Sequence, residues 1–434
     1  MTATVSPSQA AELVRSTDTL GVPLGPGVPG AFMHALGARE HFDQLDVFGA
    51  LMPDLFEVLS RPGVRYRSGF YGPAERFWLA QGADIEFVPA DFRRFAPILD
   101  ALTPRVMATA ASMPDESGRV SLSLHAGATV DQLQRAADDP DRLCVVEVSP
   151  HFPRTLGVEP DHPHSIAIDD IDVLVESDAE PFVLTEVEAD SAQRAIAHRA
   201  AEFVPDGATL QTGIGGIPNS VASVLATGSK GNFGIHSEMF TSGLMRLCES
   251  GKVTNDRKGI FDGFSVTTFA AGSRELYDWL DGNDAVRFLP VEVVNSPESI
   301  SRNAQMITIN GALSVDLSGQ VVADTKGGGQ FSGIGGHEDF IAGAGIESSD
   351  RSLVCLPSTT KVGEVAVSRI VGIPAEGTVV TTPRHQVDVV ITEHGAAELA
   401  GLTVRERARA LAEISDPSVR ESLLETAEVW PTDR

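Results

Sequence analysis

The feature that most constrains the fold is an internal similarity at about half the length of the chain. The segment from Ile85 to Val120 aligns without a gap with the segment from Val286 to Val321, at a constant offset of 201 residues. The alignment pairs FVP with FLP near its start and DESG with DLSG near its end. Coincidence between two α/β units is the alternative, but a gap-free match of this length favours a duplication.

Shorter similarities extend this match along both halves. TLGVPLGPGVPG from Thr19 resembles TLQTGIGGIPN from Thr209, and DVLVES resembles DVVITE near the end of each half. A chain of 434 residues is also long enough for two domains of ordinary size. We therefore predict two related domains, residues 1–189 and 190–434.

Both halves open with a helix-start signal. Ser6 is placed as the N-cap, with Pro7 in the first turn and Gln9 as the capping-box acceptor. The second half opens similarly, with DSAQRAIAHRAAEFV.

Short apolar runs then alternate with helical patterns in each half. The expected strands of the second half are ATLQT, NFGIH, FSVTTFA, RFLPVEVV and VDVVITE, and the expected helices are IPNSVASVLA and TSGLMRLCES. This alternation predicts two similar open α/β sheets, largely parallel. Ligands of such sheets bind beyond the carboxyl ends of the strands, so catalytic groups are sought at strand-to-helix turns.

The first candidate is the glycine loop from Gly213 to Asn219, between an expected strand and an expected helix. Its backbone N–H groups could face an anion at the helix N-terminus. A purely structural turn is the ordinary alternative. The pattern is not GxGxxG, and no acidic residue ends a following strand, which disfavours a dinucleotide.

The second candidate is Glu238, which follows the expected strand NFGIH. Aligning the halves places Ala50 opposite Glu238, so the fold does not require a carboxylate at this turn. A solvated glutamate is the usual alternative for any single Glu.

The third candidate is a segment with six glycines in ten residues, from Gly327 to Gly336. Its first-half counterpart, SLSLHAGATVDQLQ, has a single glycine. The glycines could allow the backbone to approach a ligand closely, or they could belong to a flexible surface loop. Composition does not distinguish these two explanations. Lys361 and Arg384 are further basic candidates in second-half loops, although such a residue is more often a solvated surface charge than a ligand.

Composition excludes several other classes. A formal charge of −27 disfavours nucleic acid or an anionic membrane as a partner. Three widely spaced cysteines (Cys144, Cys248, Cys355) favour free thiols in a reducing compartment, and no stretch is apolar enough to span a bilayer, so we expect a cytoplasmic protein. No His or Cys spacing typical of a metal site and no GxSxG is present, so no metal is expected.

Taken together, these elements resemble the acetyl-CoA hydrolase/transferase family, which includes acetate, propionate and 4-hydroxybutyrate CoA-transferases. The resemblance runs from about residue 8 to the end, through TGIGGIPN, GIHSEMF, KGIFDGF, INGALSVDLSGQV, FSGIGGHEDFI and VDVVITEHGAAELAGL. It implies two domains of the NagB/RpiA/CoA-transferase type and a homodimer or larger oligomer.

The resemblance also implies roles for single residues. Glu238 falls on the family's catalytic glutamate, and the amides of Ile214 and Gly336 fall on its oxyanion hole. The CoA-contacting positions fall on Gly213, Ile214, Gly215, Gly216, Ile217, Gly335, Gly336 and Lys361. His337 and Ser149 depart from the usual family residues, and we expect both to line the acyl pocket.

The expected function is transfer of CoA between an acyl-CoA and a short-chain carboxylate, through a glutamyl-CoA thioester on Glu238. No tightly bound cofactor is expected, because CoA and acyl-CoA are substrates. A glutamate of ordinary pKa is ionised at neutral pH and needs no general base. An acyl-CoA hydrolase with the same nucleophile is the nearest alternative, followed by a non-catalytic CoA-binding protein.

Overall fold

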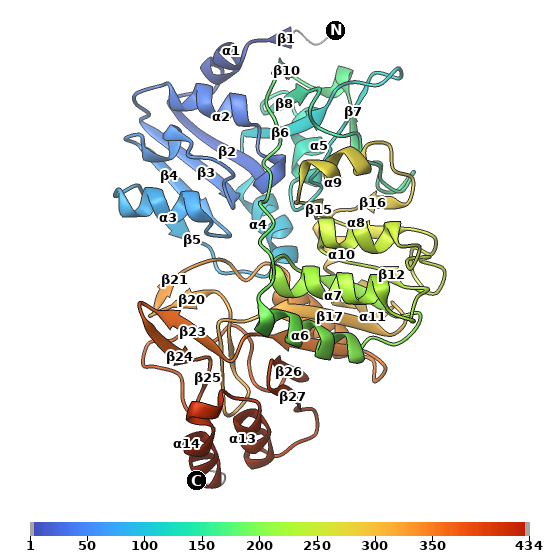
Figure 1. Cartoon of the computed structure of the whole chain (residues 1–434). Helices are drawn as coiled ribbons and strands as arrows, with labels where there is room; N and C mark the ends of the chain where they lie inside the picture. Colours follow the sequence, from blue (N-terminus) through green and yellow to red (C-terminus); the bar gives the residue numbers. More distant parts are fainter. Residues whose placement is uncertain (1–3, 430–434) are drawn as a thin grey trace.

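Two parallel sheets organise the protein in a computed structural model that describes residues 4–429 (Figure 1). The ends of the expected domains, residues 1–3 and 430–434, lie outside the described residues. The first sheet has the strand order β1-β10-β8-β6-β2-β3-β4-β5, and every neighbouring pair is parallel. Its strands are β1 (Thr4–Val5), β2 (Thr17–Leu24), β3 (Gln44–Ala50), β4 (Val64–Ser68), β5 (Ile85–Phe87), β6 (Val106–Ser112), β8 (Leu143–Ser149) and β10 (Val173–Glu176).

The second sheet has the order β12-β11-β17-β22-β26-β27 and is parallel except for its last pair. Its strands are β11 (Thr209–Thr212), β12 (Gly234–Ile235), β17 (Met306–Gly311), β22 (Arg351–Cys355), β26 (Val389–Thr392) and β27 (Gly395–Glu398). Beyond β12, a bridge between His236 and Val266 leads to the parallel pair β14 (Ser265–Thr267) and β16 (Val286–Phe288). The prediction of largely parallel α/β sheets is confirmed.

The segments aligned at the offset of 201 residues occupy corresponding places in the two sheets. The alignment lays β5 over β16 and β6 over β17. From β10 to β5 the strand order of the first sheet also matches the order from β26 through β11 to β16 in the second half. These correspondences support a duplication, while the common origin, the NagB/RpiA type and the limits 1–189 and 190–434 stay predictions.

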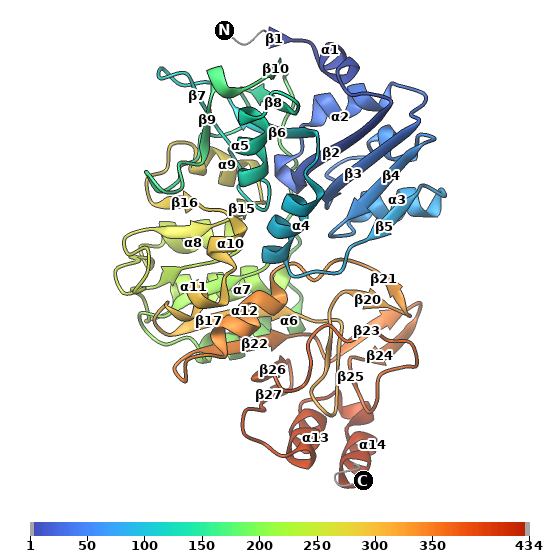
Figure 2. The ribbon, with the colours of Figure 1, turned by 180° about the vertical axis from the view of Figure 1, so that it is seen from behind.

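Helices cover both faces of the sheets (Figures 1 and 2). The first half contains α1 (Pro7–Glu12), α2 (Gly30–Gly37), α3 (Pro73–Ala80), α4 (Phe95–Leu102) and α5 (Val130–Asp138). The second contains α6 (Ser191–Glu202), α7 (Gly216–Thr227), α8 (Ser242–Glu249), α9 (Arg274–Leu280), α10 (Val291–Val294), α11 (Pro297–Ser301), α12 (His337–Ala344), α13 (Val404–Glu413) and α14 (Pro417–Glu428). None of the helices among residues 4–429 combines the length and apolar character needed to cross a bilayer.

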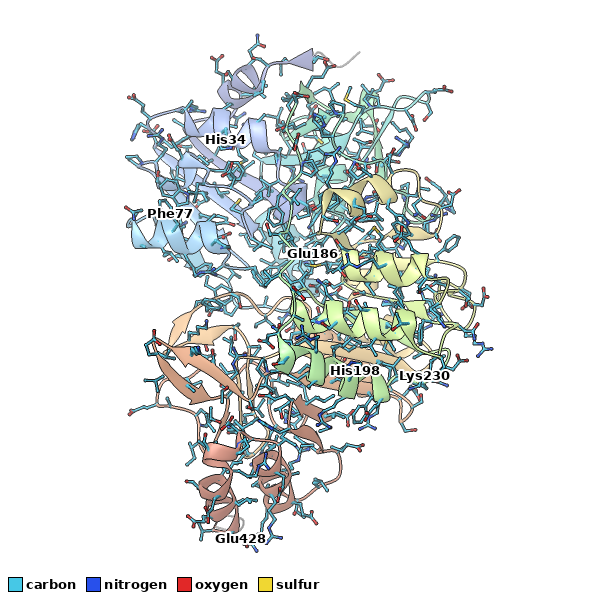
Figure 3. All side chains as sticks on the ribbon, viewed as in Figure 1. His34, Phe77, Glu186, His198, Lys230 and Glu428 are labelled. Carbon is cyan, nitrogen blue, oxygen red and sulfur yellow. The ribbon has the colours of Figure 1, made fainter. Side chains whose placement is uncertain are left out.

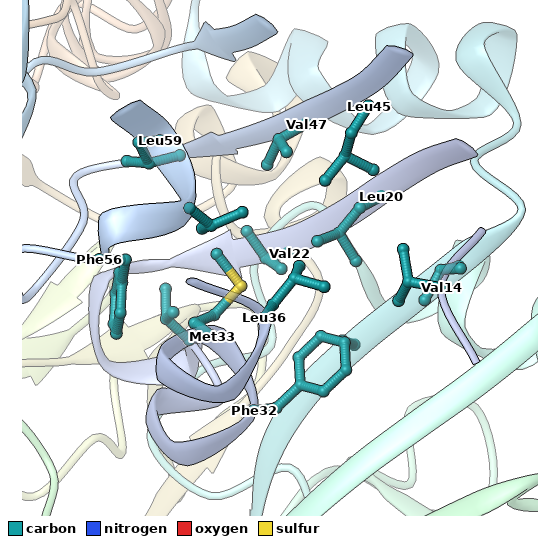
Figure 4. Packing of buried hydrophobic residues seen from close by; sticks show 14 of the residues in the cluster. Val14, Leu20, Val22, Phe32, Met33, Leu36, Leu45, Val47, Phe56 and Leu59 are labelled. Atoms are coloured by element: carbon teal, nitrogen blue, oxygen red, sulfur yellow. The ribbon is translucent and has the colours of Figure 1, made fainter. Parts of the chain in front are cut away.

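Packing of α2 on the first sheet illustrates how the cores form (Figure 4). Residues two apart in a strand point to the same face, so β2 and β3 each present a pair of apolar side chains to the helix. The buried side chains at this contact are Leu20, Val22, Leu45 and Val47 from the strands and Phe32, Met33 and Leu36 from α2. The sheet face is thereby shielded from water.

Both expected helix starts are confirmed. The Ser6 side chain accepts from the backbone N–H of Gln9, and the Gln9 side chain accepts from that of Ser6. Asp190 and Gln193 form the same capping box at α6. Each box satisfies two backbone donors that a helix N-terminus leaves unpaired.

One expected strand is wrong in its second part. RFLPVEVV was assigned as a single extended run, but only Val286–Phe288 forms a strand, while Val291–Val294 forms the short helix α10. Pro290 lacks a backbone donor for a strand, and Val291 and Val294, three residues apart, are both buried on one helix face. This turn ends with the Asn295 N–H donating to the Val291 carbonyl at 2.8 Å.

The linker between the halves, residues 177–190, has no regular structure but is held at several points. The Leu184 N–H donates to the Gly272 carbonyl at 2.9 Å, and the Tyr277 hydroxyl donates to that of Phe182 at 2.6 Å. Glu186, labelled in Figure 3, pairs with Arg246 of α8 at 3.1 Å. The later part of the linker thus lies along the second half, while its first part contacts the first half through Ser177, Asp178 and Ala179.

Candidate active site

A cavity of about 550 Å³ lies between the halves, where the carboxyl ends of strands from both sheets meet. Glu238, in the turn between β12 and β13 (Met239–Phe240), lines this cavity. Ala50, the residue aligned with Glu238, lines it as well, at the end of β3. Strand ends that correspond in the two halves therefore face one cavity.

Most of the predicted site residues meet at this cavity. Residues 213–217, Glu238 and residues 335–337 all line it. Lys361 is not among its lining residues and is exposed in the hairpin of β23 (Thr359–Val362) and β24 (Val365–Ser368). The expectation for Ser149 is wrong, because its hydroxyl donates to the Ala179 carbonyl at 2.7 Å, outside the cavity lining.

The glycine loop places an uncapped helix N-terminus in the cavity wall. Within residues 4–429 no side chain caps α7, whose N-cap Gly215 has a positive φ of 111°. At the corresponding helix of the first half, α2, the carboxylate of Glu147 accepts from the N–H groups of Ala31 and Phe32 at 3.1 and 2.9 Å. A carboxylate of the chain thus satisfies the first helix, whereas α7 has none, which suits it to an anionic ligand.

Gly336 lies directly against Glu238. A Cβ atom at Gly336 would stand 1.8 Å from Oε2 of Glu238, so any larger residue here would displace that carboxylate. The Gly336 backbone so close to the carboxylate acts to lower the pKa of Glu238. The C-terminal end of the glycine-rich segment therefore approaches the Glu238 side chain closely, while its approach to a ligand stays a prediction.

The first half anchors this glycine-rich segment. The Phe92 N–H donates to the Gly335 carbonyl at 2.9 Å, and the Arg76 guanidinium donates to the Phe331 carbonyl at 2.7 Å while lying over its ring. A freely flexible loop is not what the structure shows. The anchoring fixes Gly336 relative to Glu238.

Three polar residues that the sequence analysis missed surround the nucleophile candidate. Asn295 donates through Nδ2 to Oε2 of Glu238 at 2.6 Å and to Oδ2 of Asp339 at 3.0 Å. Asp339 also accepts from Nε of Arg93, in the first half, at 2.6 Å. Figure 2 shows α12, which carries Asp339, close to α4, which follows Arg93. These residues are far apart in sequence, so no local pattern could have connected them.

These surroundings change the expected charge of Glu238. Burial raises its pKa to about 8, the negative charge of Asp339 adds to the rise, and hydrogen bonds from Asn295 and Gly336 oppose it. Burial likewise raises the pKa of Asp339 to about 6. The expectation of a fully ionised Glu238 at neutral pH, based on the ordinary pKa, is therefore revised.

Other ionisable groups lining the cavity are poor nucleophiles or remain available for ligands. Burial raises the pKa of Cys355 to about 12 and lowers that of His337 to about 4, so a thiol and a neutral imidazole are expected. Arg369 contributes the one guanidinium among the lining residues, and its Nε has no hydrogen-bond partner within residues 4–429. Its Nη1 donates to the Ala312 carbonyl at 3.4 Å, so part of the guanidinium is held within the second half while Nε has no such partner.

A cavity at the carboxyl ends of parallel strands, lined by a carboxylate and by glycine-rich backbone, is the arrangement of a site in an α/β enzyme. Two family models match the chain: the acetyl-CoA hydrolase/transferase C-terminal domain over residues 272–427 and coenzyme A transferase over residues 194–289. The chain belongs to the acetyl-CoA hydrolase/transferase family, whose members among its relatives are enzymes that transfer or hydrolyse CoA thioesters.

Three similar proteins illustrate the family. The succinyl-CoA:cyclohexane-1-carboxylate CoA transferase of Geobacter metallireducens is 37% identical, over 97% of this chain and 94% of its own length. The 4-hydroxybutyrate coenzyme A transferase of Clostridium kluyveri is 40% identical over 72% of this chain and 70% of its own. The crystal structure of RipA from Yersinia pestis has a TM-score of 0.87 and 29% identity, covering 98% of this chain and 96% of RipA.

Proposed function

We propose that the protein moves CoA from an acyl-CoA to a carboxylic acid through a glutamyl-CoA thioester on Glu238. The observation that carries this proposal is the position of Glu238, with Gly336 against its carboxylate and the uncapped α7 in the same cavity wall. Relatives named as CoA transferases support the same reaction.

The reaction begins with ionised Glu238. One carboxylate oxygen attacks the thioester carbonyl carbon, the C–S bond breaks, and CoA leaves as its thiolate from an acyl-glutamyl anhydride. The thiolate then attacks the Glu238 carbonyl carbon, which releases the first acid as a carboxylate and leaves a glutamyl-CoA thioester. A second carboxylate reverses these steps and departs as the new acyl-CoA.

Oxyanion stabilisation is assigned to the backbone N–H groups of Ile214 and Gly336. Such donors typically contribute about 3 kcal/mol each to the transition state. Gly336 lies against the Glu238 carboxylate, so its N–H would donate to the thioester oxygen as the nucleophile moves onto the substrate.

CoA binding is assigned to residues 213–217, Gly335 and Gly336, with Lys361 outside the cavity. The N-terminal dipole of α7 and the guanidinium of Arg369 supply local positive potential in a chain with a net charge of −27. Lys361 is exposed and could reach only parts of CoA that extend beyond the cavity.

Hydrolysis is the competing outcome, because water can attack the same intermediates. Acetyl-CoA hydrolases occur among the relatives at 28–29% identity. The apolar first-half wall of the cavity favours transfer, since it leaves water few polar partners there.

The test is steady-state exchange between acetyl-CoA and a second carboxylic acid, with both acyl-CoA species followed by mass. Parallel initial-rate lines and little CoA release without acceptor support the proposal. Intersecting lines, or CoA release that acceptor acid does not change, would contradict it. The Glu238→Gln variant should lose at least about a thousandfold in rate, whereas Glu249→Gln, at the exposed end of α8, should not.

We also propose a homodimer in a reducing compartment such as the cytoplasm. Val362, Val365 and Val367 expose 65%, 65% and 41% of their surfaces on the β23–β24 hairpin, which supports burial against a second copy. The three cysteines are free thiols. Light scattering of the purified protein checks the oligomeric state, and a strictly monomeric mass would contradict it.

A further inference from the structure

The two halves contribute walls of different chemistry to the cavity. The second half brings backbone amides of residues 213–217 together with polar side chains such as Gln193, Gln211 and Asn310. The first half contributes only side chains without a polar atom, and glycine: Leu24, Ala50, Leu51, Gly69, Phe70, Phe92 and Phe95. If CoA lies along the second half, as proposed, the acyl group faces the first.

This first-half wall is a continuous apolar surface. Phe92 packs edge to face on Phe269, with ring centroids 6.0 Å apart, and Leu24, Ala50, Phe92 and Phe95 belong to one buried cluster. Leu51, Phe70 and Met239 are partly buried, pack against that cluster and line the cavity. A ligand that entered here would bury apolar surface against rings and branched side chains.

Leu51 adopts a backbone conformation that is unusual for its residue type. Its φ is +46°, in the left-handed region that leucine rarely adopts. Strained residues of this kind gather at ligand sites, where the side chain is kept despite the backbone. Gly72 makes room for its side chain, since a Cβ atom at Gly72 would lie 2.8 Å from a Leu51 methyl carbon.

Ala50, the neighbouring residue, keeps the same wall open. It ends β3 and is only 8% exposed, so its small side chain lines the cavity without filling it. A larger side chain at this position would occupy space beside Leu51. Ala50 therefore leaves space in the cavity, and Leu51 gives that space an apolar wall.

The wall offers no partner for a second polar group on the acyl chain. Among the residues lining the cavity, the one guanidinium is that of Arg369, which comes from the second half and donates through Nη1 to the Ala312 carbonyl at 3.4 Å. A distal carboxylate or hydroxyl against the first half would lose its hydration without a hydrogen bond in return.

We propose that the acyl substrate is a bulky apolar monocarboxylic acid, branched or carrying a ring, and that Leu51 and Ala50 determine this specificity. The inference rests on the proposed function, because it assigns the acyl end of that reaction. Dicarboxylic and hydroxy acids are the disfavoured substrates. Acetate fits but fills little of the wall.

The experiment measures kcat/KM for four acceptor acids with acetyl-CoA as donor: cyclohexanecarboxylate, 3-methylbutanoate, succinate and 4-hydroxybutyrate. We expect the two apolar acids to exceed the two polar acids at least about tenfold, the discrimination typical of one or two buried methylenes. Leu51→Gly, which relieves the positive φ and removes the side chain, should reduce the preference about tenfold. Ala50→Phe should selectively reduce the rate with cyclohexanecarboxylate. Leu13→Ala, exposed on the first half, is the matched control and should change neither.

Two outcomes separate this inference from the proposed function. If acetyl-CoA labels Glu238 but succinate or 4-hydroxybutyrate reacts as fast as the apolar acids, the specificity assignment is overturned and the function stands. If Leu51→Gly and Ala50→Phe keep the selectivity of the natural chain, the role of these two residues is overturned. If no acyl-CoA labels Glu238, both proposals fall together.

Discussion

The side-chain amide of Asn295 bridges two buried carboxylates, donating to Oε2 of Glu238 at 2.6 Å and to Oδ2 of Asp339 at 3.0 Å. One donor group therefore faces both the proposed nucleophile and the charge that opposes its ionisation. Arg93 donates to the other oxygen of Asp339 and brings the first half into the same network. The charge of Glu238 depends on all of these contacts.

The first prediction concerns the pH dependence of the natural chain. Because the nucleophile must be ionised and its pKa lies near 8, roughly a tenth of the free enzyme is competent at pH 7. We expect kcat/KM to rise with pH, to reach half its maximum near pH 8 and to level off above about pH 9. A profile that is flat from pH 6 to 9 would show that Glu238 ionises well below this range.

The second prediction sets two substitutions against each other. Asn295→Ala removes a donor that lowers the pKa of Glu238, so the pH profile should move to higher pH. Asp339→Asn removes a charge that raises this pKa, so the profile should move to lower pH. Profiles of kcat/KM for both variants test the assignment. Shifts in the same direction would contradict it.

The third prediction concerns Gly336. Gly336→Ala introduces a Cβ that would stand 1.8 Å from the Glu238 carboxylate, so the carboxylate must move. We expect activity to fall at least about a hundredfold, because small misplacement of a reacting group is costly. Gly345→Ala, at the other end of α12, meets its nearest atom at 3.4 Å and should retain activity. Equal losses in the two variants would indicate a general effect on the helix.

The fourth prediction concerns stability. Glu238 has a pKa of about 8 in the folded chain and about 4.5 in the unfolded chain, so its ionised form opposes folding. This loss of stability begins above pH 4.5, grows up to pH 8 and is complete above pH 8. Glu238→Gln should therefore stabilise the protein by about 2 kcal/mol at pH 9, a figure reduced for partial exposure, and by much less at pH 4.5. Denaturant unfolding at both pH values measures this. A variant less stable than the natural chain at pH 9 would contradict the raised pKa.

The sequence predicted those parts of the site that depend on local patterns. Glycine enrichment and strand-to-helix turns placed residues 213–217, Glu238 and Gly336 correctly at one cavity. Asn295 was not predicted as a site residue because the preceding VEVV has the composition of a strand. Pro290, together with the burial of Val291 and Val294, makes VEVV a helical turn instead. Arg93 and Asp339 meet only through the packing of the two halves. The pKa of Glu238 follows from that packing, so the ordinary value used for the sequence could not predict it.

The most direct test of the central claim is the intact mass of the protein after incubation with acetyl-CoA alone. The reaction exchanges a carboxylate oxygen for the CoA sulfur, so the chain should gain the mass of CoA less one water, and peptide mapping should place the adduct on Glu238. Glu238→Gln should gain nothing. An adduct on another residue, or full transferase activity in Glu238→Gln, would contradict the account.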